Sequence, residues 1–535
     1  MTVTSQAKPH VDYSVYLVTG RELLPRGKTY TECLEEALKG GVTVVQVREK
    51  TAETGEFLSI ARQTIEICRR YNVPVLINDR IDIALASGAD GIHVGQTDMP
   101  LAEARKLLPP NAIIGVSCNN IEHVKAAIAG GADYLGLGSI FPTNTKDVTE
   151  PGRIPGISGT QDMLAVLEGT TIQSVAIGGI KIDNLARVLH GCSSPNGHGL
   201  DGIAVVSEIM ASPEPRIAAE RLAKTCSSWK SVPRRPVSFT TPLSSAVAYV
   251  RRSAELLELV RTLSPLVHQI TNNVVKTQSA NATLALGGSP IMAAAAEEQV
   301  DLARIPGGLL INFGTVEDVG GMLAAGREAN KNRKPIVFDP VGVGATAHRR
   351  ATATRLLDAW QATVIKGNAA EIGAVAKLEE VASKGVDSVG SGFKDPATVV
   401  RTLARKQRCI VILSGHIDYI SDGDTVIQVS NGHPLLSQIT GSGCMLGTTV
   451  ATFCGAASME AEKEPSETDP GTLVKGDMLS PAVAGVLALT IASERAAARD
   501  TVLGPGSFLP ALIDELSLLT PDTIESSAKI TVNTL

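Results

Sequence analysis

The chain has 535 residues, which is too many for a single hydrophobic core and predicts two or three domains. Hydrophobic residues make up 44% of it, aromatic residues only 3%, and the net charge is −6. Few aromatic residues and a slightly acidic balance argue against partners such as nucleic acid or an anionic membrane. The eight cysteines lie far apart, without CxxC or Cys/His spacing, which is typical of a reducing compartment.

Neither the opening residues nor the longest apolar run indicates export or membrane insertion. The opening residues, MTVTSQAKPHVDYS, are polar and contain no apolar signal core. The longest apolar run, AVAGVLALTIA at 482–492, is too short to cross a bilayer and predicts a buried helix. We therefore expect a cytoplasmic protein.

The first part of the chain repeats one local pattern. In ALKGGVTVVQVR, ALASGADGIHVG and AIAGGADYLGLGS, a helix end is followed by glycine and then by a short strand rich in β-branched residues. Filling in the gaps between these repeats gives eight predicted strands, at 15–20, 43–50, 73–79, 91–96, 113–118, 134–141, 174–179 and 202–207. Eight strands alternating with helices predict a (β/α)₈ TIM barrel over residues 1–230.

A change of pattern marks a second domain. The stretch around SVPRRPVSFTTPLSS is rich in Pro and Ser and has no hydrophobic period, which predicts a linker at 231–245. Beyond it, the apolar strands GLLINFG, PIVFDP, TVIKGN and CIVILSG alternate with Ala-rich helices. We expect residues 246–535 to form an α/β domain with an open, mainly parallel sheet covered on both faces.

The predicted barrel strands end in residues that suit phosphate and metal. Gln46, Arg48 and Lys50 alternate along one strand end and share a face, and Arg with Lys suits a diphosphate. Asp79 and Asp98 follow neighbouring strands, and two such carboxylates can hold Mg²⁺. Each of these residues alone also fits a loop cap or a solvated strand end. Their recurrence at seven strand ends favours a phosphate and metal site.

His93 is left open between lining this site and being a core histidine with satisfied ring nitrogens. The glycine pair 178–179 and Ser207 end the last two strands, where barrels of this type usually bind phosphate.

Taken together, QVREK, NDR, GIHVGQTD, IGVS and PTNTK resemble thiamine-phosphate synthase over nearly the whole barrel. The resemblance implies that 4-amino-2-methyl-5-pyrimidinylmethyl diphosphate is coupled to hydroxyethylthiazole phosphate, with release of diphosphate. It implies that the pyrimidine diphosphate is held by Gln46, Val47, Arg48, Glu49, Lys50, Asn78, Ser117 and Lys146. It implies Mg²⁺ at Asp79 and Asp98, and thiazole phosphate at Thr143, Asn144, Thr145, Gly179, Val206 and Ser207. Mg²⁺, Arg48 and Lys146 are then expected to stabilise the departing diphosphate.

The stretch QITGSGCMLG at 438–447 raises a separate question. A glycine-rich turn that opens a helix gathers N–H donors for an anion, and a cysteine there is expected to have a lowered thiol pKa. The alternative is a tight turn beside a buried, inert cysteine. The chain has no GxxxxGK[ST] motif, so it is not a P-loop kinase.

The motifs SPIM, FDPVGVGAT, IKGNAAEI, LSGHIDYISDG and TGSGC resemble hydroxyethylthiazole kinase, a ribokinase-like family, over most of residues 250–525. The resemblance implies phosphorylation of 4-methyl-5-(2-hydroxyethyl)thiazole by ATP with Mg²⁺, which would make the substrate of the barrel. It places thiazole at Met292 and Gly441, ATP and metal at Lys366, Ser414, Asp339 and Glu371, and the catalytic base at Cys444. It also implies a homo-oligomer built on trimers of this domain.

Two positions depart from the bacterial pattern, which usually has Arg at position 366 and Thr at position 414. Lysine keeps the charge but cannot hold phosphate through two parallel hydrogen bonds. Met292 also fits a core position as a flexible gap-filler.

Two other readings use the same scaffolds. One is a barrel aldolase or phosphosugar epimerase fused to a sugar kinase, which would require a Schiff-base lysine or an acid–base pair at a sugar carbon. The other is a non-catalytic metabolite sensor, which predicts gaps in the motifs. The strand ends carry Arg/Lys and Asp pairs without such gaps, so a bifunctional enzyme of thiamine biosynthesis is the prediction.

Overall fold

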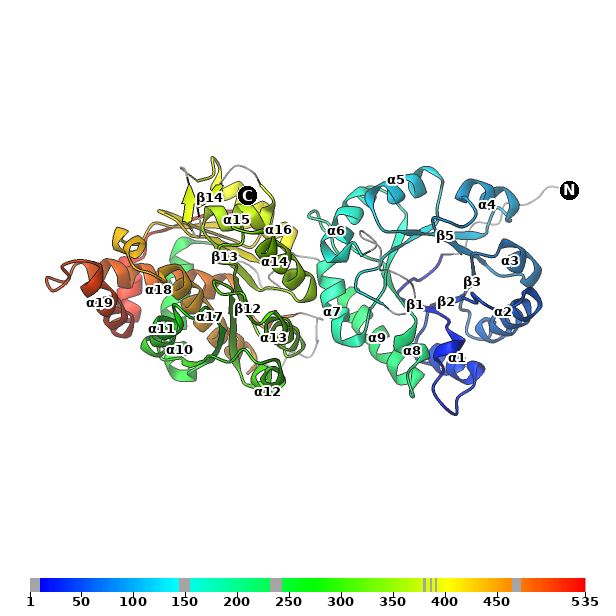
Figure 1. Cartoon of the computed structure of the whole chain (residues 1–535), viewed down its shortest axis with the longest axis horizontal. Helices are drawn as coiled ribbons and strands as arrows, with labels where there is room; N and C mark the ends of the chain where they lie inside the picture. The colour runs from blue at the N-terminus through cyan, green and yellow to red at the C-terminus, as the bar shows by residue number, and fades with distance from the viewer. Residues whose placement is uncertain are drawn as a thin grey trace. The chain divides into compact units, whose positions relative to one another are not determined.

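The computed structural model describes residues 10–143, 154–230, 243–378, 392–463 and 473–534, and the backbone of 382–384 and 387–389. The described residues fall into two compact units, which meet in sequence at the predicted linker (Figure 1). The linker boundaries stay a prediction, because residues 231–242 lie outside the described ranges.

The first unit is a closed barrel of eight parallel strands, each bonded to the next in sequence and the last to the first. This confirms the predicted (β/α)₈ fold. Its strands are β1 (Val15–Val18), β2 (Val44–Val47), β3 (Val75–Asn78), β4 (Gly91–Val94), β5 (Ile113–Cys118), β6 (Tyr134–Gly138), β7 (Gln173–Ile177) and β8 (Gly202–Val205).

Helices surround the barrel (Figure 1). They are η1 (Arg21–Leu23), α1 (Tyr30–Lys39), α2 (Thr54–Arg69), α3 (Ile81–Ser87), α4 (Leu101–Leu107), α5 (Ile121–Ala129), α6 (Gly156–Leu167), α7 (Ile182–Gly191), α8 (Ser207–Met210) and α9 (Pro215–Lys230). Alternation along each strand divides the core in two. In β1, for example, Val15 and Leu17 pack in the layer beneath the helices, whereas Tyr16 and Val18 fill the barrel interior.

The second unit contains a nine-stranded sheet in the order β10-β9-β11-β12-β13-β16-β17-β18-β19. Its first six strands are parallel: β10 (Ser289–Ile291), β9 (Leu266–Ile270), β11 (Gly307–Asn312), β12 (Ile336–Asp339), β13 (Val364–Gly367) and β16 (Ile410–Leu413). Three antiparallel strands complete it: β17 (Asp418–Ser421), β18 (Thr425–Val429) and β19 (Ile530–Thr534). A small hairpin pairs β14 (Ala382–Lys384) with β15 (Asp387–Val389). The mainly parallel sheet was expected, but the antiparallel edge was not.

The helices of this unit cover the sheet and are α10 (Ala246–Leu263), α11 (Lys276–Leu286), η2 (Ala296–Glu298), α12 (Gln299–Arg304), α13 (Val319–Lys331), α14 (Ala347–Ala359), α15 (Ala369–Ala376), α16 (Pro396–Gln407), η3 (Pro434–Gln438), α17 (Ser442–Ala461), α18 (Leu479–Ala497), α19 (Pro505–Leu518) and α20 (Pro521–Ser527).

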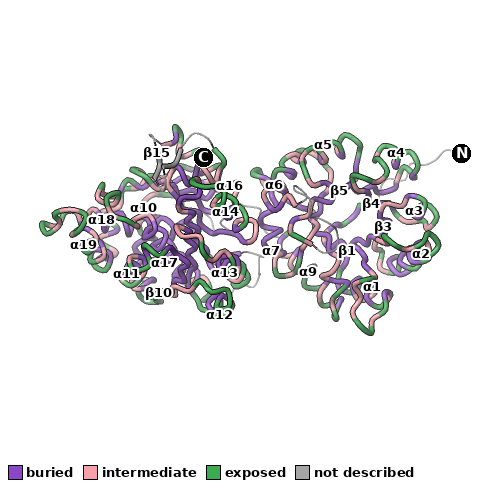
Figure 2. Tube along the Cα trace, viewed as in Figure 1, coloured by how far each residue is buried: buried purple, intermediate pink, exposed green. Residues whose placement is uncertain are grey.

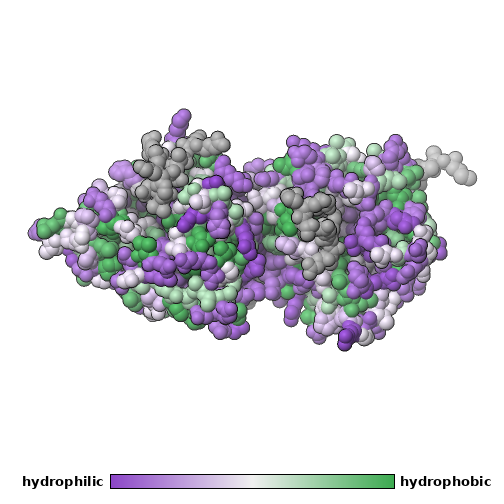
Figure 3. Space-filling model, viewed as in Figure 1, coloured by the Kyte–Doolittle hydropathy of each residue, from purple (hydrophilic) through white to green (hydrophobic). Residues whose placement is uncertain are grey.

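Two helices of this unit are buried along most of their length, α17 and α18 (Figure 2). They approach closely where a Cβ on Gly485 would lie only 2.5 Å from the Cα of Val450. The apolar run at 482–492 lies in α18, which confirms that it is a core helix. Across the described ranges, no helix combines the length and hydropathy that crossing a bilayer requires. The visible surface of each unit mixes hydrophilic and hydrophobic patches (Figure 3), as is normal for a folded protein.

Candidate active sites

The carboxyl ends of β2, β3 and β4 bring three predicted residues of the barrel together. The Lys50 ammonium pairs with the Asp79 carboxylate, and Asp79 also interacts with Asp98. Asp79 directly follows β3 in the left-handed region, with φ of 62°, a conformation that turns its side chain out of the strand path. Burial and the Asp98 carboxyl raise the pKa of Asp79, while Lys50 opposes them.

This donor set fits the predicted magnesium ion. Mg²⁺ is usually held by one or two carboxylates together with waters and substrate phosphates, and the two neighbouring aspartates match that pattern. The described residues contain no group of three or more His, Cys, Asp or Glu side chains that could enclose a metal. The two aspartates therefore suit a metal ion that is also bound by a phosphorylated substrate, and they do not form a structural metal site closed by protein ligands.

The QVREK strand end does not present all of its side chains to one place. Val47 is fully buried in the layer between barrel and helices. The Glu49 carboxylate accepts two hydrogen bonds from Arg21, at 2.8 and 3.0 Å. The backbone N–H of Arg48 donates to Thr19 Oγ1 at 3.0 Å. The side chains of Val47 and Glu49 are thus committed to the scaffold.

Polar side chains at the top of the barrel interior are almost closed off from solvent. Gln46 is 4% exposed and its amide nitrogen donates to the Tyr16 hydroxyl at 2.7 Å. Asn78, which ends β3, is 8% exposed. The ring nitrogens of His93 bond Tyr134 and Ser117, at 2.7 and 2.9 Å. His93 is therefore a buried histidine with both nitrogens partnered, and one of the partners is a predicted site residue.

The predicted phosphate corner follows β7 and β8. Gly178 and Gly179 both have positive φ, and a Cβ on Gly179 would lie 2.7 Å from Pro142 O, so the turn requires glycine. Val206 precedes α8 and Ser207 begins it. Thr143 is the last described residue before the gap at 144–153, so Asn144, Thr145 and Lys146 lie outside the described residues.

Sequence reasoning missed one cation at this corner. Lys181 Nζ lies 3.0 Å from Ser207 Oγ and 3.3 Å from a Glu208 carboxylate oxygen. A cavity of about 350 Å³ opens beside these three residues. The signal in the sequence was the lysine two positions after the glycine pair.

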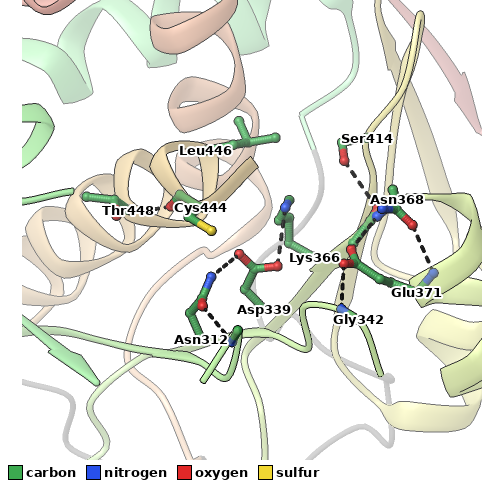
Figure 4. A network of polar contacts seen from close by, with 12 residues as sticks. Asn312, Asp339, Gly342, Lys366, Asn368, Glu371, Ser414, Cys444, Leu446 and Thr448 are labelled. Atoms are coloured by element: carbon green, nitrogen blue, oxygen red, sulfur yellow. Dashed lines mark hydrogen bonds and ion pairs between the residues drawn. The ribbon is translucent and has the colours of Figure 1, made fainter. Parts of the chain in front are cut away.

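In the second unit, a buried ion pair occupies the carboxyl edge of the parallel strands (Figure 4). Asp339 ends β12, and its Oδ1 lies 3.2 Å from Lys366 Nζ on β13, with side chains only 0% and 4% exposed. Asn312, at the end of β11, donates to the other Asp339 oxygen at 2.7 Å. Burial disfavours the Lys366 ammonium, but the carboxylates of Asp339 and Glu371 outweigh it, so the pKa of Lys366 is raised.

Glu371 and Ser414 are held by backbone groups beside this pair. The two Glu371 oxygens accept the N–H groups of Gly342 and Asn368, at 3.0 and 2.9 Å, which joins the loop after β12 to the start of α15. Ser414 Oγ donates to Gly367 O at 3.3 Å. Glu371 and Ser414 thus lie beside the Asp339–Lys366 pair, and the Glu371 carboxylate acts on Lys366 through its charge (Figure 4).

The glycine-rich turn lies against the same network. Gly441 caps α17 with φ of 87°, and a Cβ there would come within 2.6 Å of Val275. A Cβ on Gly443 would lie 3.2 Å from Lys366 Nζ. Gly441 has no room for a side chain and Gly443 has little, so the first turn of α17 brings backbone N–H groups close to the Lys366 ammonium.

Cys444 faces the ion pair from α17, with its Sγ 3.5 Å from Asn272 Nδ2 (Figure 4). The expectation of a lowered thiol pKa was wrong. Burial, helped by the Asp339 charge, raises the pKa of Cys444 to about 11, and this outweighs the opposing effects of Lys366 and of hydrogen bonds from Asn312 and Asn272. The thiol is 8% exposed, so desolvation of the thiolate dominates.

Met292 follows β10 and is half-buried rather than enclosed in the core. The next residue, Ala293, accepts a hydrogen bond from His268 Nε2 at 2.7 Å, which fixes this loop against β9. The Asn272 side-chain nitrogen donates a hydrogen bond to Asn312 Oδ1. This asparagine pair was not singled out from the sequence, because only the fold places it beside Cys444 and Asp339.

The barrel carries paired carboxylates and basic groups at its strand ends. The sheet of the second unit carries a buried Asp–Lys pair at its edge, under a glycine-rich turn. Together these two sites define an enzyme with two phosphate-handling domains. Comparison with known proteins agrees with this class. Residues 15–209 match the family model "Thiamine monophosphate synthase", and residues 257–522 match the "Hydroxyethylthiazole kinase family".

Relatives match both the whole chain and each half. The chain is 40% identical to the "Probable thiamine biosynthetic bifunctional enzyme" of Schizosaccharomyces pombe, over 97% of either protein. It is 46% identical to the "Thiamine-phosphate synthase" of Clostridium novyi, covering 40% of this chain and 98% of that one. It is 40% identical to the "Hydroxyethylthiazole kinase" of Methanocorpusculum labreanum, covering 52% and 98%. The chain belongs to the family of thiamine biosynthetic bifunctional enzymes.

The predicted combination of thiamine-phosphate synthase and hydroxyethylthiazole kinase is therefore confirmed. The aldolase or epimerase reading and the sensor reading lose their support, since both halves match enzymes of one biosynthetic route.

Proposed function

We propose that the two domains catalyse successive steps. The second domain phosphorylates 4-methyl-5-(2-hydroxyethyl)thiazole with ATP, and the barrel couples the product to 4-amino-2-methyl-5-pyrimidinylmethyl diphosphate, giving thiamine phosphate and diphosphate. The observation that carries this proposal is that each domain has its own phosphate-competent site. One is Lys50 with Asp79 and Asp98, and the other is the Asp339–Lys366 pair beneath the TGSGC turn.

In the barrel, Asp79 and Asp98 would hold Mg²⁺, which when bound neutralises negative charge on the diphosphate. Lys50, Arg48 and Lys146 balance the charge of the departing diphosphate, so that the pyrimidine methylene becomes cationic before the thiazole nitrogen attacks. The thiazole nitrogen supplies its own lone pair, and no side-chain base is required.

The remaining barrel residues position the two substrates. Gln46, Asn78 and Ser117 lie in the nearly closed barrel mouth and suit the pyrimidine, with Val47 and Glu49 contributing through their backbone. The thiazole phosphate is assigned to Thr143, Asn144, Thr145, Gly179, Val206 and Ser207. The tight glycine turn and the neighbouring Lys181 support an anion at this corner.

In the kinase domain, the thiazole hydroxyl oxygen forms the new bond to the γ-phosphorus of ATP while the bond to ADP breaks. The hydroxyl proton passes to Cys444 Sγ in its thiolate form, which becomes the neutral thiol. Lys366 and the first-turn N–H groups of α17 stabilise charge on the phosphoryl oxygens. Asp339, Glu371 and Ser414 position ATP and its Mg²⁺, and Met292 and Gly441 contact the thiazole.

We also propose a cytoplasmic homo-oligomer assembled through trimers of the kinase domain. This rests on the family resemblance and on the composition of the chain. Light scattering on the purified protein measures its mass, and a monomer at working concentration would overturn the assembly.

One incubation tests the proposed function. Purified protein with the thiazole alcohol, ATP, Mg²⁺ and the pyrimidine diphosphate should yield thiamine phosphate. Omitting ATP should stop the reaction, and adding thiazole phosphate should restore it. Folded protein that makes no thiamine phosphate from the two phosphorylated substrates would contradict the assignment of the barrel.

A further inference from the structure

A line of hydrogen bonds crosses the barrel interior and joins two predicted substrate residues. Five strands contribute one side chain each, and the successive distances are 2.7, 2.8, 2.7 and 2.9 Å. We call these residues the barrel chain, and in bonded order they are Gln46, Tyr16, Tyr134, His93 and Ser117. Its ends, Gln46 and Ser117, belong to the proposed pyrimidine site. Its three middle residues have no role in the proposed function.

The strands leave room for this chain by using glycine. A Cβ on Gly115 of β5 would lie 2.0 Å from the ring of Tyr134, and one on Gly136 of β6 would lie 3.2 Å from the His93 ring. Tyr16 and Tyr134 are 1% and 0% exposed. A hydroxyl sealed in this way must find partners within the protein, because an unsatisfied one costs stability. The barrel interior is therefore built around the polar rings of Tyr16, Tyr134 and His93, although apolar side chains would fill it without needing hydrogen-bond partners.

With the Gln46 amide nitrogen as the donor to Tyr16, one direction of the remaining bonds gives every buried proton of the barrel chain an acceptor. The amide nitrogen of Gln46 donates to Tyr16, so the Tyr16 proton goes to Tyr134 and the Tyr134 proton goes to His93 Nδ1. A neutral histidine that accepts at Nδ1 carries its proton on Nε2 and donates it to Ser117 Oγ.

This direction determines what the two ends offer to a ligand. The barrel chain uses one of the two N–H groups of the Gln46 amide, and the Gln46 carbonyl oxygen stays available as an acceptor. Ser117 Oγ has accepted from His93, so its own proton is the group it can donate. An aminopyrimidine diphosphate has an amine that donates hydrogen bonds and a diphosphate that accepts them. The amine matches the Gln46 carbonyl oxygen, and the diphosphate matches the Ser117 hydroxyl at the other end of the barrel chain.

We propose that Tyr16, Tyr134 and His93 are positioning residues of the synthase site, which orient Gln46 as an acceptor and Ser117 as a donor for the pyrimidine diphosphate. The proposal rests on the proposed function of the barrel and adds how substrate polarity is selected.

Tyr134→Phe removes one hydroxyl from the middle of the barrel chain and keeps the ring. We expect kcat/KM for the pyrimidine diphosphate to fall on the order of tenfold, since two neighbours lose a partner. The KM for thiazole phosphate should stay unchanged, and so should the kinase activity of the same polypeptide. The matched control is Tyr13→Phe, because Tyr13 is 3% exposed, packs against Tyr134 with ring centroids 4.6 Å apart and is not a member of the chain.

A double-mutant cycle with Ser117→Ala separates positioning from simple damage. If Tyr134 acts through Ser117, adding Tyr134→Phe to Ser117→Ala should cost clearly less than tenfold. His93→Gln, which can accept at Oε1 and donate at Nε2, should retain more activity than His93→Leu. Fully additive losses, equal losses for the two His93 variants, or a Tyr13→Phe loss as large as that of Tyr134→Phe would each overturn the proposal.

The same measurements keep this proposal apart from the proposed function. An unmutated protein that fails to couple the two phosphorylated substrates contradicts the assignment of the barrel itself. A protein that couples normally but is indifferent to Tyr134→Phe contradicts only the positioning role.

Discussion

Replacing Cys444 by alanine tests whether its thiol accepts the substrate proton during thiazole phosphorylation. The pKa of about 11 means that about one molecule in 10⁴ carries the thiolate at pH 7, and forming it costs about 5 kcal/mol. Phosphoryl transfer depends mainly on positioning and charge stabilisation, which Lys366 and the α17 turn still supply. We therefore expect Cys444→Ala to lower kcat at pH 7 by only about tenfold, which is below the usual range of general-base effects.

The pH dependence is the sharper measurement. Since the thiolate population rises tenfold for each pH unit below the pKa, the ratio of parent to Cys444→Ala rates should widen steadily from pH 7 to pH 10. The assay is ADP release in the presence of thiazole alcohol, run at saturating ATP and Mg²⁺. Cys444→Asp, ionised at lower pH, should show a flatter profile and keep or raise the neutral rate if its charge is tolerated beside Asp339.

Two controls accompany this series. Cys444→Ser keeps the size and the Asn272 contact but cannot ionise in this range, so it should follow the alanine variant. Cys454→Ala removes a fully buried thiol from the same helix, away from the ion pair, and should keep the parent pH profile. A parent-like rate for Cys444→Ala at every pH would show that Cys444 is a packing residue and would refute this reasoning.

Three further changes test other parts of the chain. Asp79→Asn should lower coupling on the order of a hundredfold or more and leave kinase activity intact, and equal loss of both would indicate misfolding. Burial raises the pKa of Asp418 to about 7, so the folded state binds this proton more tightly than the unfolded chain. The free energy of unfolding therefore falls by up to about 4 kcal/mol as the pH rises from 4 to 7. Asp418→Asn, which can still accept the 2.9 Å bond from Gly415 N, should raise the melting temperature at pH 8 but not at pH 4, and an equal shift at both would contradict this. A fragment of residues 1–230 should make thiamine phosphate from both phosphorylated substrates, and a folded but inactive fragment would contradict separable domains. A shorter fragment that ends at Ser228 should have a lower melting temperature, because it loses the buried Trp229, which is 6% exposed.

The sequence by itself determined the architecture of each domain. Seven of the eight barrel strands fall within their predicted ranges and β7 begins one residue earlier, at Gln173, since each strand is a short run rich in apolar residues. The four predicted strands of the second domain correspond to β11, β12, β13 and β16, which are likewise short apolar runs. Strand-end residues such as Lys50 and Asp79 could be singled out because parallel strands bring their carboxyl ends to one edge.

Other features depended on contacts between residues far apart in the chain. The antiparallel strand β19 pairs with β18 from about a hundred residues away, and no local pattern records that partner. The barrel chain likewise depends on which side chains meet inside the closed sheet, which a list of strands does not specify. Only the fold brings His93 to both Tyr134 and Ser117.

Cys444 shows most clearly where local reasoning ends. Its position at a helix N-terminus, read from TGSGC, predicted a lowered thiol pKa. The structure covers that thiol and places Asp339 beside it, so the pKa rises instead. A helix dipole follows from a few neighbouring residues, whereas desolvation depends on everything that packs around the group, and here the tertiary structure decides the sign.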